Sequence, residues 1–203
     1  GQKRRANAVL YSLNDSATFK SDFFQLEKTL IETRLCEAYS VQNVRTLEHG
    51  LSITKNLGTL YQQCKVLLEL AAVLISLDEK TKAHEYSKQA RRVARTNGYR
   101  PLGARALLLM GLTAEKPRER QFCLLGALQA ADEIGLPELA AESAFHLGSF
   151  HMDNGNYVTA REYLVRSISV TSGLAEEVPA AWRPAYLARS WRRNARKTLE
   201  RCN

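Results

Sequence analysis

Histidines and cysteines are the first residues to consider for chemistry, and the chain has four of each. His146 and His151 are the closest pair of histidines, but they stand five residues apart, whereas metal ligands on one helix face are three or four apart. The cysteines are Cys36, Cys64, Cys123 and Cys202. None of them belongs to a CxxC pair, so the spacing indicates no metal site and predicts packed or surface histidines and reduced thiols.

Motifs of phosphate-binding and hydrolytic enzymes are absent from the sequence. It contains neither GxxxxGK[ST] nor GxGxxG, and no GxSxG elbow. The adjacent carboxylates Asp78-Glu79 and Asp132-Glu133 are expected at helix ends or on solvent-facing surfaces, without a second group at catalytic distance. We therefore expect no enzymatic activity and no cofactor. An enzyme remains a remote alternative, which would require a pocket with perturbed titratable groups.

Positive charge is concentrated at the C-terminal end. The chain has a formal net charge of +8, and its last 25 residues hold seven cationic side chains against Glu200 alone, which leaves the rest close to neutral. Four arginines recur there at i, i+3, i+4 and i+7 of an expected helix: Arg189, Arg192, Arg193 and Arg196. Together with Trp182 and Trp191 they would suit nucleic-acid phosphates or an acidic protein. The preferred interpretation is a solvated helix face whose arginine stems cover the aromatic side chains.

Helical elements are expected to position all of these residues. Apolar residues recur at i, i+3, i+4 and i+7 through most of the chain, and glycine and proline fall mainly between those segments. The longest apolar run, 66–77, is interrupted by Glu69 and is too short to span a membrane. No signal peptide follows the basic opening Lys3-Arg4-Arg5, so a cytoplasmic location is expected. The start at Gly1 suggests a piece of a larger protein.

One segment carries a specific repeat signature. Residues 141–174 contain Leu147-Gly148 for a close helix approach, Gly155-Asn156-Tyr157 at a turn, and Ala160 where the second helix crosses the first. This segment resembles a tetratricopeptide repeat of 34 residues, except that His151 stands where the family usually has tyrosine. The resemblance implies an all-α fold, a right-handed α–α superhelix of about four helical hairpins closed by a C-terminal capping helix.

Weaker copies of the same frame occur upstream. The four expected repeats cover 25–58, 64–97, 104–137 and 141–174, within a repeat region of 16–174. Their starts lie 39, 40 and 37 residues apart, so we expect helices or links longer than in the standard repeat. Residues 1–15 are expected to be flexible or partly ordered, and they are candidates for filling the groove of the superhelix. Residues 175–203 are expected to form the basic capping helix.

A second resemblance concerns the last third of the chain. The stretch VPAAWRPAYLARSWRRNARKTLERC is similar to the tails that close repeat arrays in large bacterial signalling proteins, which carry a kinase, a STAND or AAA+ ATPase, or a sigma-54-type activator module. This resemblance implies a regulatory arm that binds protein. Nucleic-acid binding through the arginine-rich helix is the alternative function from a different class.

The tetratricopeptide resemblance also implies which residues face a partner. In that family the first helix of each repeat lines a concave groove. The corresponding residues here are Lys65, Leu68, Arg105, Leu108, Leu112, Glu142, Phe145, Ser149 and Met152. Such an apolar groove would suit an amphipathic helix or an extended apolar segment. The alternative is that these side chains belong to the core. Self-association through Phe23 and Phe24 is a third expectation.

Overall fold

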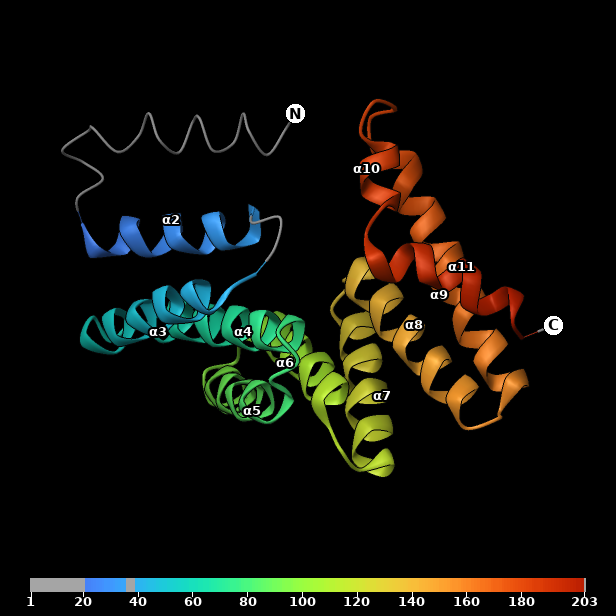
Figure 1. Cartoon of the computed structure of the whole chain (residues 1–203), viewed down its shortest axis with the longest axis horizontal. Coiled ribbons are helices and arrows are strands. Elements are labelled where there is room, and N and C mark those ends of the chain that lie inside the picture. The colour runs from blue at the N-terminus through green and yellow to red at the C-terminus, as the bar shows by residue number, and fades with distance from the viewer. Residues whose placement is uncertain (1–20, 36–38, 203) are drawn as a thin grey trace. The chain divides into compact units, whose positions relative to one another are not determined.

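The computed structural model describes residues 21–35 and 39–202, and every regular element in that part is a helix (Figure 1). Cys36 and the predicted segment 1–15 lie outside the described residues. The helices are α2 (Asp22–Leu35), α3 (Val41–Asn56), α4 (Leu60–Ser76), α5 (Lys80–Thr96), α6 (Arg100–Thr113), α7 (Pro117–Glu133), α8 (Pro137–Asp153), α9 (Tyr157–Glu177), α10 (Arg183–Leu187) and α11 (Ser190–Glu200).

Consecutive helices pack as hairpins, most extensively α4 with α5, α6 with α7 and α8 with α9. The chain divides into two compact units, Gly1–Tyr99 and Arg100–Asn203. Described by itself, the first unit holds α2 to α5 and the second holds α6 to α11. The predicted all-α class of sequentially packed helical repeats is confirmed.

The helices are longer than the 34-residue frame allows, which explains the spacing of the repeats. Helices α4, α5, α7 and α8 each have 17 residues. Three of the predicted frames, at 64, 104 and 141, begin four residues inside the first helix of a hairpin, since those helices start at Leu60, Arg100 and Pro137. The signature residues Gly148 and Ala160 therefore lie within helices and Gly155 lies in the turn between them, while the added residues lie at the amino ends of the first helices.

Most of the described turns between α3 and α9 contain a residue with positive φ. Gly155, between α8 and α9, has φ 75°, a conformation that glycine adopts without steric cost. Asp78, between α4 and α5, takes the same conformation with φ 60° and is the described non-glycine residue with positive φ. The Pro117 and Pro137 rings occupy the first turns of α7 and α8, where the missing N–H has no partner to lose.

Close helix approach within each hairpin depends on small residues, as the signature predicts. A Cβ added at Gly148 would lie 2.7 Å from Leu164 Cγ and 3.1 Å from the Ala160 carbonyl oxygen. Ala160 itself is fully buried. Helices α8 and α9 therefore touch at this crossing with no room for one further methyl group.

The C-terminal region differs from the predicted single capping helix over 175–203. Helix α9 continues to Glu177, α10 has five residues, and α11 begins only at Ser190. Pro179 interrupts the helix because it lacks an N–H and restricts the preceding Val178, which has ψ 132°. It is α11 that covers α8 and α9, with Trp191 and Ala195 packed in a cluster with Phe145.

Candidate functional site

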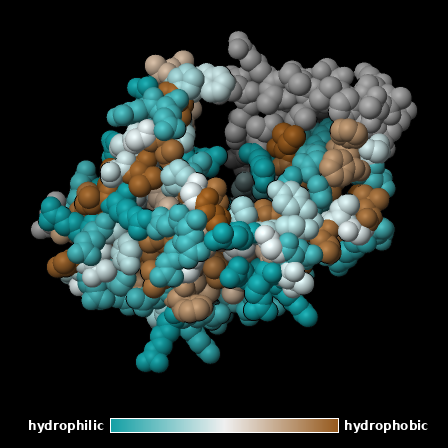
Figure 2. Space-filling model, turned by 180° about the vertical axis from the view of Figure 1, so that it is seen from behind, coloured by the Kyte–Doolittle hydropathy of each residue, from teal (hydrophilic) through white to brown (hydrophobic). Residues whose placement is uncertain are grey.

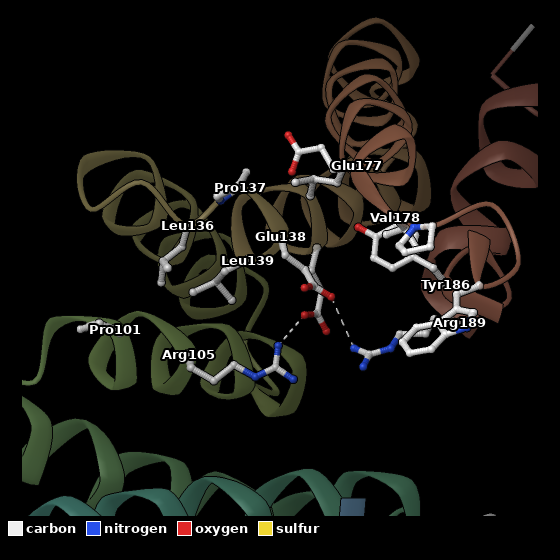
Figure 3. A pocket seen from close by; sticks show the side chains of 14 residues that line it. Pro101, Arg105, Leu136, Pro137, Glu138, Leu139, Glu177, Val178, Tyr186 and Arg189 are labelled. Atoms are coloured by element: carbon white, nitrogen blue, oxygen red, sulfur yellow. Dashed lines mark hydrogen bonds and ion pairs between the residues drawn. The ribbon is translucent and has the colours of Figure 1, made fainter. Parts of the chain in front are cut away.

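A pocket of about 850 Å³ lies in the second unit, lined by described residues (Figure 3). Its walls come from the starts of α6 and α8, the end of α9, and the segment that leads through α10 to α11. The lining residues are Pro101, Arg105, Leu136, Pro137, Glu138, Leu139, Glu142, Leu174, Glu177, Val178, Pro179, Trp182, Tyr186 and Arg189. Apolar side chains and prolines therefore alternate with charged groups around the opening.

One ion pair links the first helices of two successive hairpins across this pocket. Arg105 of α6 donates from Nη1 to Glu142 Oε2 of α8 at 2.5 Å. Both residues occupy positions that the tetratricopeptide resemblance assigns to partner contact, and Figure 3 shows Arg105 pointing toward the middle of the pocket. The pair is partly buried, so it holds a fixed polar feature within a mainly apolar wall.

A second charged group attaches the C-terminal segment to the pocket. Glu138, in the first turn of α8, accepts from Arg192 and lies 3.5 Å from Arg189. The guanidinium of Arg192 stacks 3.6 Å from the Tyr186 ring centroid, and its Nη1 donates to the Tyr186 carbonyl oxygen at 2.5 Å. Burial raises the pKa of the Tyr186 phenol, and the nearby Arg192 charge opposes that rise.

The predicted basic surface is therefore wrong in part. Arg192 is 4% exposed, and its Nε is among the buried polar atoms without a hydrogen-bond partner. Arg189 is exposed but lies beside Glu138. Of the four predicted arginines, Arg193 and Arg196 remain on the exposed face of α11. The regular spacing misplaced Arg192 because its burial depends on Glu138 and Tyr186, which a helical pattern does not reveal.

Two pocket residues, Trp182 and Glu177, keep their functional groups exposed within the described fold. Trp182 is 54% exposed, so the expectation that arginine stems cover the aromatic side chains is wrong for this ring. Glu177 is exposed at the end of α9, and within the described part of the chain no ion pair forms on its carboxylate. An indole face and a free carboxylate beside prolines can accept an apolar segment that carries a positive charge.

The predicted groove residues divide into core and surface. Leu68, Leu108 and Phe145 are buried, so the expectation that they face a partner is wrong and their alternative assignment to the core holds. Leu112 is only partly buried but packs against the core of the second unit. A helix packed between two neighbours buries a wider face than one apolar stripe suggests.

The remaining groove residues keep some exposure, and apart from Ser149 they already have partners inside the chain. Lys65 Nζ lies 2.7 Å from Glu27 Oε1 in the first unit. Met152 Sδ lies 3.4 Å from the Cys202 sulfur, at the end of α11. Ser149 is partly buried on α8. Of the nine predicted residues, Arg105 and Glu142 thus reach the pocket.

The sequence pattern did not predict the pocket, because it predicted one continuous helix over 175–203. Pro179 and Pro184 were the available signal, since two prolines five residues apart interrupt a helix and fold the chain back. This local break carries Trp182 and Tyr186 to the amino end of α8. Without it, Trp182 would be placed on the same continuous helix as Trp191.

Other surfaces show exposed apolar residues singly or in small groups. Phe23 and Phe24 on α2 are each 40% exposed and pack edge to face at 6.0 Å, as the self-association expectation requires of accessible rings. On the face seen in Figure 2, small hydrophobic areas are separated by hydrophilic side chains. Phe122 on α7 is 75% exposed and is not among the residues that line the pocket.

The described residues provide neither a metal-binding cluster nor a membrane-spanning helix. No group of three or more histidine, cysteine or acidic side chains with metal-binding geometry occurs in 21–35 and 39–202. His151 stacks on Tyr163 at 5.6 Å, and burial lowers its pKa. No helix in the described part of the chain is both long and apolar enough to cross a membrane.

Comparisons with known proteins support the fold and leave the family open. No protein-family profile matches the chain, and no curated protein matches it. Among solved structures the chain is similar to BtubC (BKLC) from P. vanneervenii, with a TM-score of 0.66 and 13% sequence identity, over 99% of this chain and 87% of that one. At this identity the likeness concerns the fold alone.

Proposed function

We propose that this chain is a protein-interaction module, and that its partner binds the pocket beside Trp182. The observation that carries the proposal is a pocket of about 850 Å³ that combines an exposed indole with the carboxylate of Glu177, which forms no ion pair with another described residue. Tryptophan is enriched among residues that dominate binding energy at protein interfaces. Helical repeats stack to present such concave surfaces.

The fitting partner segment is apolar and carries at least one lysine or arginine. The prolines and leucines of the pocket would cover apolar side chains, while Glu177 and the face of Trp182 would bind the cation. The ion pair between Arg105 and Glu142 fixes the opposite wall, so little side-chain ordering is required on binding. This refines the expected amphipathic partner and moves its site from the helix faces to the pocket.

We further propose that the module serves as the regulatory arm of a larger bacterial signalling or transcription-control protein, in the cytoplasm. The support is the resemblance of residues 178–202 to the tails of such arms. In this role the module binds and does not catalyse, so neither an enzymatic activity nor a cofactor is proposed. The identity of the partner tests this proposal.

Site-specific photocrosslinking tests the binding site directly. p-Benzoylphenylalanine is placed at residue 182 in one variant and at residue 122 in a matched control, because both positions carry an exposed aromatic ring. After illumination in a bacterial lysate treated with nuclease, we expect a discrete protein adduct at 182 and none of the same mass at 122. Its identification as a kinase, an ATPase or a transcription regulator would support the regulatory arm.

Identical adducts at both positions, or none at 182, would refute the pocket as the binding site. An adduct with a second copy of this chain would identify self-association as the interaction. The variants Trp182→Ala and Phe122→Ala give a second comparison, since removing either exposed ring should leave the fold intact and only the first should release the partner.

A further inference from the structure

Charge is segregated between the first and second helices of the hairpins in the first unit. The second helices, α3 and α5, carry eight cationic side chains against two carboxylates, Glu48 and Glu85. The cations are Arg45, Lys55, Lys80, Lys82, Lys88, Arg91, Arg92 and Arg95. The first helices, α2 and α4, carry three cations against four carboxylates. The near-neutral total expected from the sequence therefore conceals one strongly basic side.

Most of this positive charge is on α5 and is only partly neutralised. Lys80, Lys82 and Lys88 form exposed ion pairs with Asp78, Glu79 and Glu85 at 3.2 to 3.4 Å. For Arg91, Arg92 and Arg95 the structure gives no ion pair with any other described residue. Exposed pairs such as those of the lysines are weak and are readily exchanged for an external anion.

The exposed cations follow one line along the helix. Lys88, Arg92 and Arg95 stand at i, i+4 and i+7, which places them on one face, opposite the buried Ala83, Ala90 and Ala94. The line spans about 10 Å, from the helical rise of about 1.5 Å per residue. Because arginine presents a planar fork of donors, this row suits successive anionic groups of one extended partner.

The composition of this face indicates the class of partner. Every residue that α5 leaves exposed is polar or charged, whereas a protein interface is built around an apolar core. Interfaces with nucleic acid are more polar and more positively charged, and most of their hydrogen bonds go to phosphate and sugar. The corresponding helices of the second unit, α7 and α9, each carry two cations against three carboxylates, so the basic face belongs to the first unit.

We propose that the exposed face of α5, which carries Lys88, Arg92 and Arg95 with the half-buried Arg91 at its edge, binds the sugar–phosphate backbone of a nucleic-acid duplex. Binding is by charge and does not depend on base sequence, since no aromatic side chain is exposed on α5 to stack on a base. This surface is separate from the pocket of the second unit, and its function does not depend on a protein partner there.

The test measures the fluorescence anisotropy of a labelled DNA duplex and of an RNA duplex of equal length, titrated with the full chain. Four phosphate contacts predict that the logarithm of the binding constant falls with that of salt with a slope of about 3.6, or on the order of 100-fold between about 50 and 200 mM salt. The two duplexes show which nucleic acid is preferred.

Two charge-reversed variants locate the binding surface. K88E/R92E/R95E on α5 and R193E/R196E/K197E on α11 each replace two arginines and one lysine that are exposed, so they change net charge equally. We expect the α5 variant to lose binding and most of the salt slope, a reduction of about 3, while the α11 variant loses much less. Circular dichroism melts show whether the α5 variant is still folded. The neutral K88Q/R92Q/R95Q variant shows whether removing the positive charges, without adding negative ones, is enough to weaken binding.

Four outcomes would overturn the proposal. Loss of binding with the α11 variant alone would assign it to the C-terminal helix. Equal loss of duplex binding with both variants would show that binding depends on the net charge of the chain and not on a site at α5. Tighter binding of a labelled poly-glutamate peptide than of either duplex would identify an acidic protein segment as the partner. A chain that binds no duplex at about 50 mM salt would also refute it.

Discussion

The buried guanidinium of Arg192, in the first turn of α11, donates to Glu138, 54 residues earlier in the first turn of α8. This contact, with the stacking of Arg192 on Tyr186, attaches the C-terminal segment to the last hairpin. The Arg192 side chain is nearly inaccessible, whereas that of Glu138 is half exposed. Removing the Glu138 carboxylate would therefore leave a buried cation without its counterion, whereas removing Arg192 would leave a carboxylate that is still half exposed to water.

Glu138→Gln should lower the free energy of unfolding by about 1–3 kcal/mol, because it leaves a buried charge without its counterion. The loss is smaller than for a fully buried pair, since Arg192 keeps the Tyr186 carbonyl and ring. Urea unfolding followed by tryptophan fluorescence measures it, as both tryptophans, Trp182 and Trp191, lie in this segment. The control is Glu177→Gln, at an exposed carboxylate. Equal midpoints for the two variants would show that the contact does not stabilise the fold.

Gly148→Ala should destabilise the second unit by about 1–3 kcal/mol, as expected for overpacking a close helix crossing. The new methyl group would lie 2.7 Å from Leu164 Cγ and would also meet the Ala160 backbone. Gly173→Ala on α9 is the matched control, because an added Cβ there has no neighbour within 4 Å. It should stabilise the helix by about 0.5–1 kcal/mol. Thermal and urea unfolding of both variants would contradict this account if the two changes had the same sign.

Acid should destabilise the second unit through His146. Burial and the nearby Arg105 charge lower the pKa of His146 from 6.5 to about 4. Between these values the unfolded state binds the proton and the folded state does not, so this contribution is complete above pH 6.5 and is lost as pH falls toward 4. The loss of unfolding free energy can reach about 3 kcal/mol. We expect a smaller loss, because part of the His146 side chain remains accessible to solvent.

The pH dependence is measured from urea midpoints of the intact chain and of His146→Gln between pH 7 and 4. The variant should show a flatter profile, since its side chain does not titrate. His151, whose pKa burial also lowers, remains in both proteins and contributes equally. Parallel profiles for the two proteins would exclude His146 as the origin of the acid sensitivity.

Asp78→Gly should stabilise the first unit by about 0.5–1 kcal/mol, because Asp78 adopts a positive φ that costs less for glycine. Asp78→Ala should have the opposite effect, since alanine has no side-chain oxygen to offset the same conformation. The exposed ion pair to Lys80 is lost in both variants and cancels from the comparison. Far-UV circular dichroism is the appropriate probe, as residues 1–99 contain no tryptophan.

The fold was accessible from the sequence because its determinants are local. Helical periodicity, Leu147-Gly148 and the turn at Gly155 act over a few residues, and they predicted the packing of α8 on α9. The same local signals placed the expected repeat starts four residues late, because the repeat frame follows the small residues inside each hairpin and not the prolines Pro101 and Pro137 in the first turns of α6 and α8. A periodic pattern identifies a face of a helix more reliably than it identifies a first residue.

The site was less accessible because burial depends on partners that are distant in sequence. Leu108 and Phe145 belong to an apolar stripe that would suit a groove as well as a core, and only the packing of neighbouring helices decides between them. Arg192 shares its spacing with exposed arginines and differs from them through its combined contacts with Glu138 and Tyr186. Trp182 became a pocket residue through two prolines that interrupt the expected helix.

Helices that pack extensively on one another are mostly neighbours along the chain, and the most distant such pair is α8 with α11. Short loop closures are entropically inexpensive, so a topology of this kind reaches its native contacts quickly and commonly folds on a microsecond to millisecond scale. Synthesis on the ribosome adds residues far more slowly than that. The first two hairpins therefore have time to fold before α11 has been translated, and the attachment of Arg192 to Glu138 is among the last native contacts to form.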